Sequence, residues 1–357
     1  MNEATPTASP ERPLFEWVPR DRVPWCALGE LPTRVEEVAP NVWVKRDDLS
    51  SPIYGGNKVR TLEALFGQAK ALGKRRVVST GAFGSNHALA AILHAPRVGL
   101  EGGAILFPQP ASPAALENAR AIASARPHLT AIPHWSFLPF AMAYARGTDR
   151  SSYFMVPGGA TPEGALAYVS AGVELARQVA DGALARPREV VVGVGSTCTS
   201  AGLLVGMRLA AYAGIGWREP PTLRAVRVTP WPVTSAFRIV GLAHRAAAHL
   251  ASLSGEPRFA FDKRTLAARL IVDGSQLGGG YGEPTDAGRR AIAWWREHAG
   301  FELDTTYSAK AAAAVDARRG PVLFWSTKST APLPPDDADA IASAPRAMRR
   351  WIEAAGH

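Results

Sequence analysis

Hydrophobic residues recur along this chain first at helical spacing and then in short continuous runs. Between residues 62 and 72 the helical spacing is carried by Leu62, Leu65, Phe66, Ala69 and Leu72. Gly73 ends that predicted helix, and the run Arg76-Val77-Val78-Ser79 predicts a strand directly after it.

The same alternation continues toward the C-terminus. It predicts helices over 85–96, after Ser112-Pro113, over 162–180 and over 200–212, and strands at 42–44, 104–107, 129–132, 190–192, 225–228 and 322–325. A terminal helix ending near Ala355 contains Pro345, which predicts a kink or a break at that point. Strands and helices in turn indicate an α/β fold with parallel or mostly parallel sheets flanked by helices.

The length of the chain, 357 residues, favours two domains. Residues 1–20 are polar and rich in proline, and they predict a flexible N-terminal arm. The rhythm of the elements suggests one α/β unit inside another. We therefore expect a larger domain formed by residues 21–69 and 166–357, and a smaller inserted domain over 70–165.

Composition excludes several classes of protein. Hydrophobic residues make up 47% and charged residues 20%, as in globular proteins. The net charge is +9, but the arginines are scattered and form no basic stripe with interleaved aromatics, so we expect small anionic molecules rather than nucleic acid as partners.

The two cysteines, Cys26 and Cys198, form no CxxC pair and predict neither a disulfide framework nor a metal site. A secretory signal and a membrane-spanning apolar run are both missing from the pattern, so a cytoplasmic location is expected.

Lys58 is the first candidate for chemistry. It ends the segment Tyr54-Gly55-Gly56-Asn57-Lys58, between a predicted strand and a predicted helix. Two glycines let the backbone approach closely, and a lysine held there is well placed to carry a cofactor aldehyde as a Schiff base. The alternative is a surface lysine in a glycine turn.

Two further glycine turns lie between a strand and a helix. Gly193-Val194-Gly195-Ser196-Thr197-Cys198-Thr199 offers backbone N–H groups and a helix N-terminus to a phosphate, although such turns are also common in α/β proteins without a ligand. The other turn, Gly81-Ala82-Phe83-Gly84-Ser85-Asn86-His87, is the candidate for binding a substrate carboxylate. Here Ser85 could instead be only a helix N-cap, and His87 only a helix histidine with its hydrogen bonds satisfied.

These motifs together resemble the D-cysteine desulfhydrase and 1-aminocyclopropane-1-carboxylate deaminase family, of which the chain would be a divergent member. The resemblance runs in consistent order over roughly residues 40–330 and rests on Lys45-Arg46-Asp47-Asp48-Leu49, Gly55-Gly56-Asn57-Lys58-Val59-Arg60, Ser85-Asn86-His87, Pro157-Gly158-Gly159, Gly164-Ala165-Leu166-Ala167-Tyr168-Val169 and Ala201-Gly202-Leu203. It implies the two-domain tryptophan synthase beta-like fold (fold type II) and pyridoxal 5'-phosphate as cofactor.

The resemblance also implies roles for individual residues. Lys58 would hold the cofactor and move protons at the substrate α carbon, while Asn86 would bond the cofactor's ring hydroxyl. The substrate would be bound by Ser85, Asn86 and His87. The phosphate would be bound by Gly195, Ser196, Thr197, Cys198 and Thr199.

Three further residues match functional positions of the family. Thr327 matches the partner of the ring nitrogen. Tyr281 and Tyr307 match two active-site tyrosines, which can stack on the ring or act as general acid or base. The catalytic set expected from the resemblance is therefore Lys58, Ser85, Tyr281 and Tyr307.

Several positions depart from the family pattern. We call the predicted phosphate-binding turn, residues 193–199, the cradle. Thr197 and Cys198 occupy positions in it where small residues are usual, and Ser326-Thr327-Lys328-Ser329 replaces His-Thr-Gly-Gly. Ser308 replaces the glutamate that the deaminases carry, and His87 resembles the desulfhydrase branch. The Arg-Gln that commonly follows the carboxylate motif is replaced within Ala88-Leu89-Ala90-Ala91.

The reaction implied is β-elimination from a small amino acid, with D-cysteine as the first candidate, giving a 2-oxo acid and ammonia. Deamination of 1-aminocyclopropane-1-carboxylate is the nearer alternative. A non-catalytic protein that binds the cofactor or an amino acid is the other, because fold does not fix function. A homodimer is expected only because relatives of this fold often form one.

Overall fold

Two β-sheets organise the molecule. The computed structural model describes residues 12–229, 231, 233–280, 282–305 and 307–356. Within them, a six-stranded sheet has the order β1-β2-β10-β7-β8-β9, and a four-stranded sheet has the order β5-β4-β3-β6. Pairing is parallel throughout except between β1 and β2, so the predicted mostly parallel sheets are confirmed.

The strands and helices have the following bounds. The strands are β1 Val35–Ala39, β2 Val42–Arg46, β3 Arg76–Ala82, β4 Glu101–Phe107, β5 His128–Ala131, β6 Ser152–Phe154, β7 Glu189–Val194, β8 Thr222–Arg227, β9 Leu270–Asp273 and β10 Val322–Ser326. The α-helices are α1 Asn57–Ala71, α2 Asn86–His94, α3 Pro113–Ser124, α4 Leu138–Thr148, α5 Pro162–Ala180, α6 Cys198–Tyr212, α7 Ala236–Ser254, α8 Lys263–Ala267, α9 Asp286–Ala299, α10 Ser308–Ala312, α11 Ala338–Ser343 and α12 Arg346–Ala355. Short 3-10 helices cover Pro13–Glu16, Arg20–Arg22, Asp47–Leu49, Ala95–Val98, Trp135–Phe137, Pro157–Gly159, Pro257–Phe259 and Ala317–Arg319.

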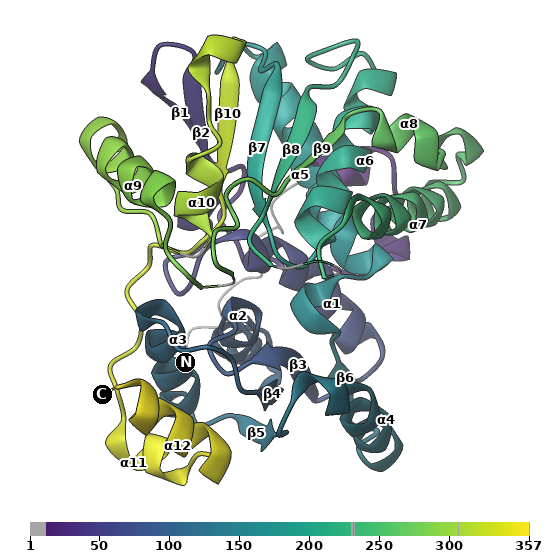
Figure 1. The fold of residues 1–357 in the computed structure, drawn as a ribbon. Coiled ribbons are helices and arrows are strands. Elements are labelled where there is room, and N and C mark those ends of the chain that lie inside the picture. The colour runs from purple at the N-terminus through teal and green to yellow at the C-terminus, as the bar shows by residue number, and fades with distance from the viewer. Residues whose placement is uncertain (1–11, 230, 232, 281, 306, 357) are drawn as a thin grey trace, which may run out of the picture.

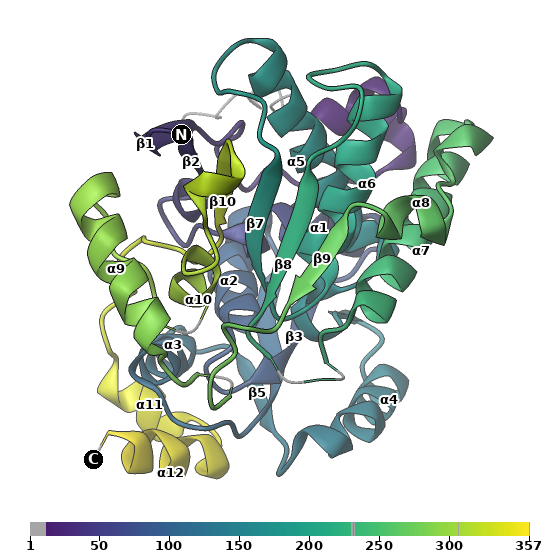
Figure 2. The same ribbon diagram turned by 45° about the horizontal axis from the view of Figure 1, so that its top comes forward.

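The six-stranded sheet is covered by helices on both faces. Along β7 every residue is buried, and alternate side chains enter different cores: Val190 and Val192 pack with α5, α6 and α7, whereas Val191 packs with α9 and α10. Figure 2 shows these helices on the two sides of the sheet. A strand buried on both faces reads as a continuous apolar run, which is why residues 190–192 are recognisable from the sequence.

The four-stranded sheet is layered in the same way. Ala104 and Leu106 of β4 face α2 and α3, while Ile105 packs with Leu138 and Met142 of α4 on the other face. We refer to the six-stranded sheet with its helices as the large lobe, and to the four-stranded sheet with α2, α3, α4, α11 and α12 as the small lobe (Figure 1).

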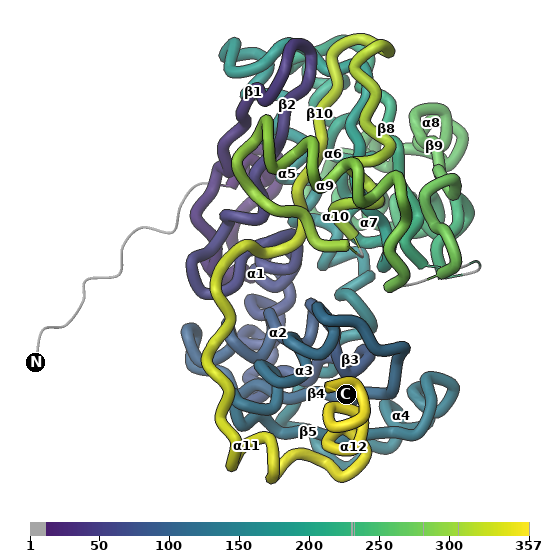
Figure 3. Tube along the Cα trace, turned by 60° about the vertical axis from the view of Figure 1, so that its left-hand side comes forward, coloured from purple at the N-terminus to yellow at the C-terminus, as the bar shows by residue number. Residues whose placement is uncertain are grey.

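The segment after β10 crosses from the large lobe to the small lobe, where the last two helices pack. Met348 and Ile352 share a core with Phe83 and Ile122 of the small lobe. Figure 3 shows the chain leaving β10 and running along the molecule to reach α11 and α12. The sequence pattern places residues 166–357 with the larger domain; the proposed boundaries remain a prediction. The expected break at Pro345 is confirmed, because α11 ends at Ser343 and α12 begins at Arg346.

Residues 12–18 pack onto the large lobe, contrary to the flexible arm expected over residues 1–20, of which 1–11 lie outside the described residues. Leu14 and Val18 are buried against α5, and the Leu14 N–H donates to Ser170 Oγ at 3.3 Å. Arg12 forms a buried ion pair with Glu63 at 2.5 Å. The apolar residues here are too few and too irregular to give a periodic signal, so the sequence pattern does not reveal the packing.

A cluster of four buried charges ties α1 to β2 and α5. Arg60 contacts Asp47 and Glu174, each at 2.8 Å, and Lys45 contacts Glu174 at 2.5 Å. Tyr168 donates to Asp47 at 2.7 Å. These charges balance, and their side chains are at most 4% exposed. Because Arg60 stands two residues after Lys58, the cluster fixes the first turn of α1.

The pKa of Glu174 reflects this environment. Burial alone would raise it, but Arg60 and Lys45 lower the pKa to about 2. A carboxyl group with a depressed pKa stabilises the fold above its ordinary pKa of 4.5, and that contribution is lost as the pH falls toward 2.

Replacing Glu174 by glutamine should therefore destabilise the protein strongly. Glu174→Gln leaves two buried cations without their shared carboxylate, and we expect a loss of about 3–5 kcal/mol in the free energy of unfolding at neutral pH. Urea unfolding measures it, and the deficit relative to wild type should shrink between pH 4.5 and about 2. Asp286→Asn, in an exposed pair, is the control; equal losses in the two variants would contradict the prediction.

Candidate active site

Both glycines before Lys58 are required by close backbone contacts. A Cβ at Gly55 would lie 2.2 Å from the Asp48 carbonyl oxygen, and one at Gly56 would lie 2.5 Å from that of Thr327. Gly56 also has a backbone φ of +89°, a conformation that residues with a side chain rarely adopt. The Asn57 N–H donates to the Thr327 carbonyl at 3.0 Å, so the turn is fastened to the segment after β10.

Lys58 projects from the first turn of α1 toward the cradle turn. Its Nζ lies 3.5 Å from Ser196 Oγ, and the neighbouring Asn57 donates to Thr199 at 2.9 Å. Burial of the amine lowers the pKa of Lys58. A lowered pKa increases the fraction of neutral amine, which is the nucleophilic form, so the predicted Schiff-base lysine has suitable surroundings.

The cradle turn leads from β7 into the buried start of α6. Thr197, at the N-cap position, makes no side-chain capping bond within the described structure, and Thr197 and Thr199 are at most 6% exposed. A buried helix N-terminus without a cap leaves N–H groups that need an acceptor. Residues 195–199 therefore fit an anion such as a phosphate group.

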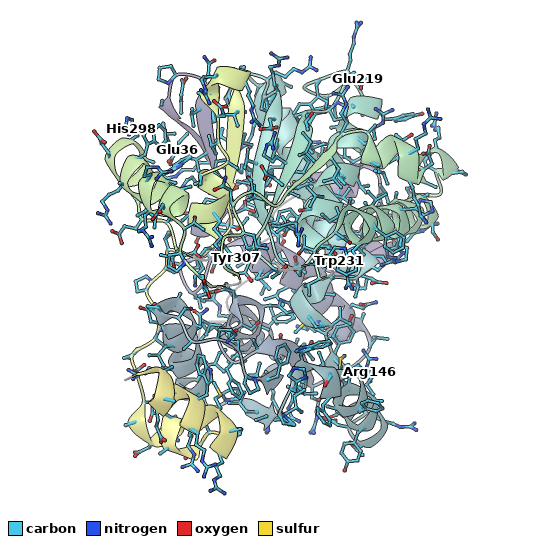
Figure 4. The ribbon with its side chains drawn as sticks, in the orientation of Figure 1. Glu36, Arg146, Glu219, Trp231, His298 and Tyr307 are labelled. Carbon is cyan, nitrogen blue, oxygen red and sulfur yellow. The ribbon has the colours of Figure 1, made fainter. Side chains whose placement is uncertain are left out.

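Gly195 allows a tyrosine to lie against this cradle. A Cβ there would come within 3.1 Å of Tyr307 Cε1 and 3.2 Å of its hydroxyl oxygen. Asp304 orders the tyrosine's backbone by accepting from the N–H of Tyr307 at 2.7 Å and from that of Ser308 at 2.9 Å. Figure 4 shows Tyr307 at the level where the two lobes meet. Tyr281, the other expected tyrosine, lies outside the described residues.

The side chain of Cys198 contacts the Pro157–Gly159 turn rather than contributing to the cradle. Its thiol donates to the Gly159 carbonyl at 3.2 Å, and burial raises the pKa of Cys198 to about 11. The thiol is therefore protonated and packs the start of α6 against the Pro157–Gly159 turn. Only backbone groups of Cys198 are available to an anion.

Ser85 is the N-cap of α2, the structural role considered for it in the sequence analysis. Its Oγ accepts from the Ala88 N–H at 3.3 Å. The next residue, Asn86, accepts two hydrogen bonds at Oδ1, from the Tyr54 hydroxyl and from Asn118 Nδ2, each at 2.8 Å. The amide nitrogen of Asn86 is thereby the group left to donate to a ligand.

His87 is a buried histidine whose ring nitrogens lack hydrogen-bond partners in the described residues. It is 2% exposed, and neither ring nitrogen has a hydrogen-bond partner within the described part of the chain. Burial, and then the charge of Lys58, lower the pKa of His87 to about 3, so the ring is neutral. A buried polar group without a partner indicates a missing ligand, and a neutral imidazole can donate to a carboxylate.

The structure therefore gathers most of the expected residues. Lys58, residues 195–199, His87 and Tyr307 lie together around the start of α6, and Thr327 reaches the glycine turn through its carbonyl group. The roles of Thr327, Ser85 and Tyr281 stay predictions. No group of His, Cys, Asp or Glu suited to a metal ion occurs in the described residues.

Sequence patterns missed four residues at the site. Tyr54 and Asn118 donate to Asn86, and Lys328 contacts both of them. Thr234 donates to the Gly195 carbonyl at 2.7 Å. Tyr54 and Lys328 adjoin recognised motifs and could have been suspected. Asn118 and Thr234 carry no local signal, because only the fold brings them near.

Comparison with known proteins identifies relatives across the whole fold. A family model described as pyridoxal-phosphate dependent enzyme matches residues 26–323. Nocardicin C-9' epimerase of Nocardia uniformis subsp. tsuyamanensis is 33% identical over 88% of this chain and 97% of its own length. D-cysteine desulfhydrase of Salmonella paratyphi C is 28% identical over 84% of this chain and 90% of its own.

A solved structure agrees with these matches. The crystal structure of an ACC deaminase homologue superposes with a TM-score of 0.71 at 26% identity, covering 89% of this chain and 95% of that one. The predicted family resemblance and fold class are confirmed. No helix among the described residues is long and apolar enough to cross a membrane.

His87 should make the fold sensitive to acid. The unfolded chain binds a proton at His87 below about pH 6.5, whereas the folded chain does so only near pH 3, so this residue lowers stability as the pH falls between those values. In ligand-free protein, wild type should lose roughly 2 kcal/mol more than His87→Gln between pH 7 and pH 4.5. Urea unfolding at both pH values tests this, with the exposed His298→Gln as control. Parallel pH curves for wild type and His87→Gln would contradict it.

Proposed function

We propose, since the chain belongs to the family of pyridoxal-phosphate dependent enzymes, that it removes the α proton of a small amino acid and eliminates a β substituent. The products would be a 2-oxo acid and ammonia. The predicted cofactor is confirmed by the family. The observation that carries the proposal is the partly buried Lys58 amine beside the uncapped start of α6, with His87, whose ring nitrogens have no partner in the described residues, nearby.

The residues present fit the cofactor. When bound, pyridoxal phosphate supplies an aldehyde that amines attach to and a ring that withdraws electrons from the α carbon. Residues 195–199 would hold its phosphate group through backbone N–H groups and the dipole of α6. Asn86 would donate from its amide nitrogen to the ring hydroxyl.

Lys58 would accept the α proton at Nζ. Its pKa is lowered by burial, which suits a base that must be neutral to take a proton and then give it up. Ser196, 3.5 Å away, helps to orient the amine. Tyr307, whose ring lies against Gly195, is the candidate acid for the leaving group.

His87 and the start of α2 would hold the substrate carboxylate. The imidazole is neutral and its nitrogens have no partner within the described chain, so it can donate one hydrogen bond without adding charge. The Ser85 hydroxyl accepts from the Ala88 N–H and keeps its own proton free to donate. This set would orient the α carbon–hydrogen bond toward Lys58.

Epimerisation is a second candidate, supported by a relative matched over nearly its whole length. Nocardicin C-9' epimerase shares 33% identity over 97% of that protein. Epimerisation would use the same proton removal by Lys58 but would return a proton to the opposite face of the α carbon. Deamination of 1-aminocyclopropane-1-carboxylate stays a third candidate, and a non-catalytic protein is not favoured by relatives with enzyme names.

Two further proposals concern the oligomeric state and the location of the protein. We retain the homodimer and the cytoplasmic location expected from the sequence. Size-exclusion chromatography with light scattering measures the first, and fractionation of the source cells measures the second.

Removing the Lys58 amine should abolish cofactor attachment and turnover. Lys58→Met should lose the visible absorbance of the bound cofactor and at least about 10³-fold in kcat, the upper part of the range for a general base. Absorbance spectra and steady-state assays measure both. Lys263→Met, at an exposed lysine, is the control; a Lys58→Met variant with wild-type spectrum and activity would refute the role.

The products that are released distinguish the candidate substrates and the candidate reactions. With D-cysteine we expect sulfide, 2-oxo acid and ammonia in equal amounts, whereas 1-aminocyclopropane-1-carboxylate would release 2-oxobutanoate and ammonia. Running a panel of D- and L-amino acids in deuterium oxide distinguishes the epimerase, which would exchange the α proton and invert the centre without forming a 2-oxo acid. Absence of 2-oxo acid from every substrate would refute β-elimination.

A further inference from the structure

Lys328 lies where the chain departs from the family pattern, and its ammonium group contacts two residues that donate to Asn86. It lies in the segment after β10 that bridges to Gly56. Its ammonium group is 2.8 Å from the Tyr54 hydroxyl oxygen, 3.4 Å from Asn118 Oδ1 and 5.0 Å from the centre of the Tyr54 ring. The two partners that it donates to are therefore the same two residues that donate to Asn86.

The ammonium group forces the direction of every hydrogen bond in this set. A lysine can only donate, so the Tyr54 oxygen accepts from Lys328 and the single Tyr54 proton goes to Asn86 Oδ1 at 2.8 Å. Asn118 likewise turns its oxygen to Lys328 and its nitrogen to Asn86 Oδ1, at 2.8 Å, and to the Gly84 carbonyl, at 3.0 Å.

Asn86 is left with one orientation. Its carbonyl oxygen accepts two bonds, so rotating the amide by half a turn would bring an N–H donor against the Tyr54 and Asn118 donors. Tyr54 and Asn118 are buried, at 1% and 3% exposed, so water does not easily replace these bonds. The amide nitrogen of Asn86 is therefore the group that can donate to a ligand.

The set also joins the lobes. Lys328 follows β10 of the large lobe, whereas Tyr54 shares the buried core of the small lobe, and Asn86 and Asn118 belong to α2 and α3 of that lobe. Figure 1 shows α2 and α3 on the side of the small lobe nearest the six-stranded sheet. Correct orientation of Asn86 thus depends on both lobes.

We propose that Lys328 is a positioning residue that acts through Tyr54 and Asn118 to hold Asn86 toward the ring hydroxyl of pyridoxal phosphate. Its charge, separated from the ring hydroxyl by Tyr54 and Asn86, also favours the ionised form of that hydroxyl. The inference rests on the cofactor placement of the proposed function, and it adds a residue that this placement does not include.

Other charged groups face the same residues and must be held constant. Asp304, before α10, acts on Tyr54 through its charge, and His94 of α2 lies 2.9 Å from the Tyr54 carbonyl oxygen through Nε2. Lys58 and His87 face the ligand side. All four are unchanged in the test variants, so a difference between variants reports on Lys328 and Tyr54.

The test is a pH titration of the absorbance of bound pyridoxal phosphate in the holoenzyme. Lys328→Met keeps the length of the side chain but removes the donor and the charge, and Tyr54→Phe keeps the ring but breaks the path to Asn86. Lys328→Met should raise the titration midpoint by about one pH unit, the size expected for loss of a nearby charge. Tyr54→Phe keeps that charge and loses only the hydrogen bond to Asn86, so it should raise the midpoint by a smaller amount. Cofactor dissociation should quicken on the order of tenfold, as for loss of one charge-assisted hydrogen bond.

Two further variants separate positioning from general damage. Lys328→Arg should restore most of the wild-type midpoint, because it keeps charge and donors. Ser329→Ala is the matched control: it removes the 2.8 Å bond from the Gly55 N–H in the same segment without touching Tyr54, and should leave the midpoint unchanged. The double variant of Lys328→Met and Tyr54→Phe should shift no further than the larger single change, as residues acting in one chain do.

The outcomes are distinct. A wild-type midpoint in both Lys328→Met and Tyr54→Phe, or additive shifts in the double variant, would overturn the proposal while leaving turnover by the wild type untouched. A wild-type protein that binds the cofactor but converts no substrate would refute the proposed function. The pH titration of the bound cofactor's absorbance would still decide the role of Lys328. If Lys328→Met fails to fold, the midpoints of Tyr54→Phe and Lys328→Arg decide between the two outcomes.

Discussion

The buried charges around Arg60 are the constraint on which the site depends. Arg60 is bonded to Asp47 before α1 and to Glu174 on α5, and Lys45 of β2 completes the set. Such pairs add little net stability compared with apolar packing, but an unmatched member would be costly, so only one arrangement of these elements satisfies all of them. That arrangement holds the first turn of α1, and with it Lys58, against the start of α6.

The scaffold and the site differ in how their polar groups are satisfied. Around Arg60 the buried charges contact one another, whereas at the site the ring nitrogens of His87 have no partner in the described part of the chain and the N-terminus of α6 has no side-chain cap. Native proteins keep few such groups without a reason. An anion at α6 and a carboxylate at His87 would satisfy both, which is the chemistry that the family's cofactor and an amino acid provide.

The departures from the family pattern have different structural meanings. Cys198 leaves the backbone of the cradle in place, because its thiol is used against Gly159. Lys328 instead places a charge next to Tyr54, in a segment where the family has glycine. A substitution in a motif is therefore not informative by its position alone; what the side chain contacts decides whether it preserves the site or changes it.

The alternation of strands and helices, the glycine turn before Lys58 and the order of the motifs can be read from the sequence, because spacing and glycine requirements are local properties of the chain. Three features follow only from the folded chain: α11 and α12 cover the small lobe, residues 12–18 are packed, and Lys328 contacts Tyr54 across a separation of 274 residues. The reason is the strand order: β10 inserts between β2 and β7, and no local pattern specifies which strands become neighbours.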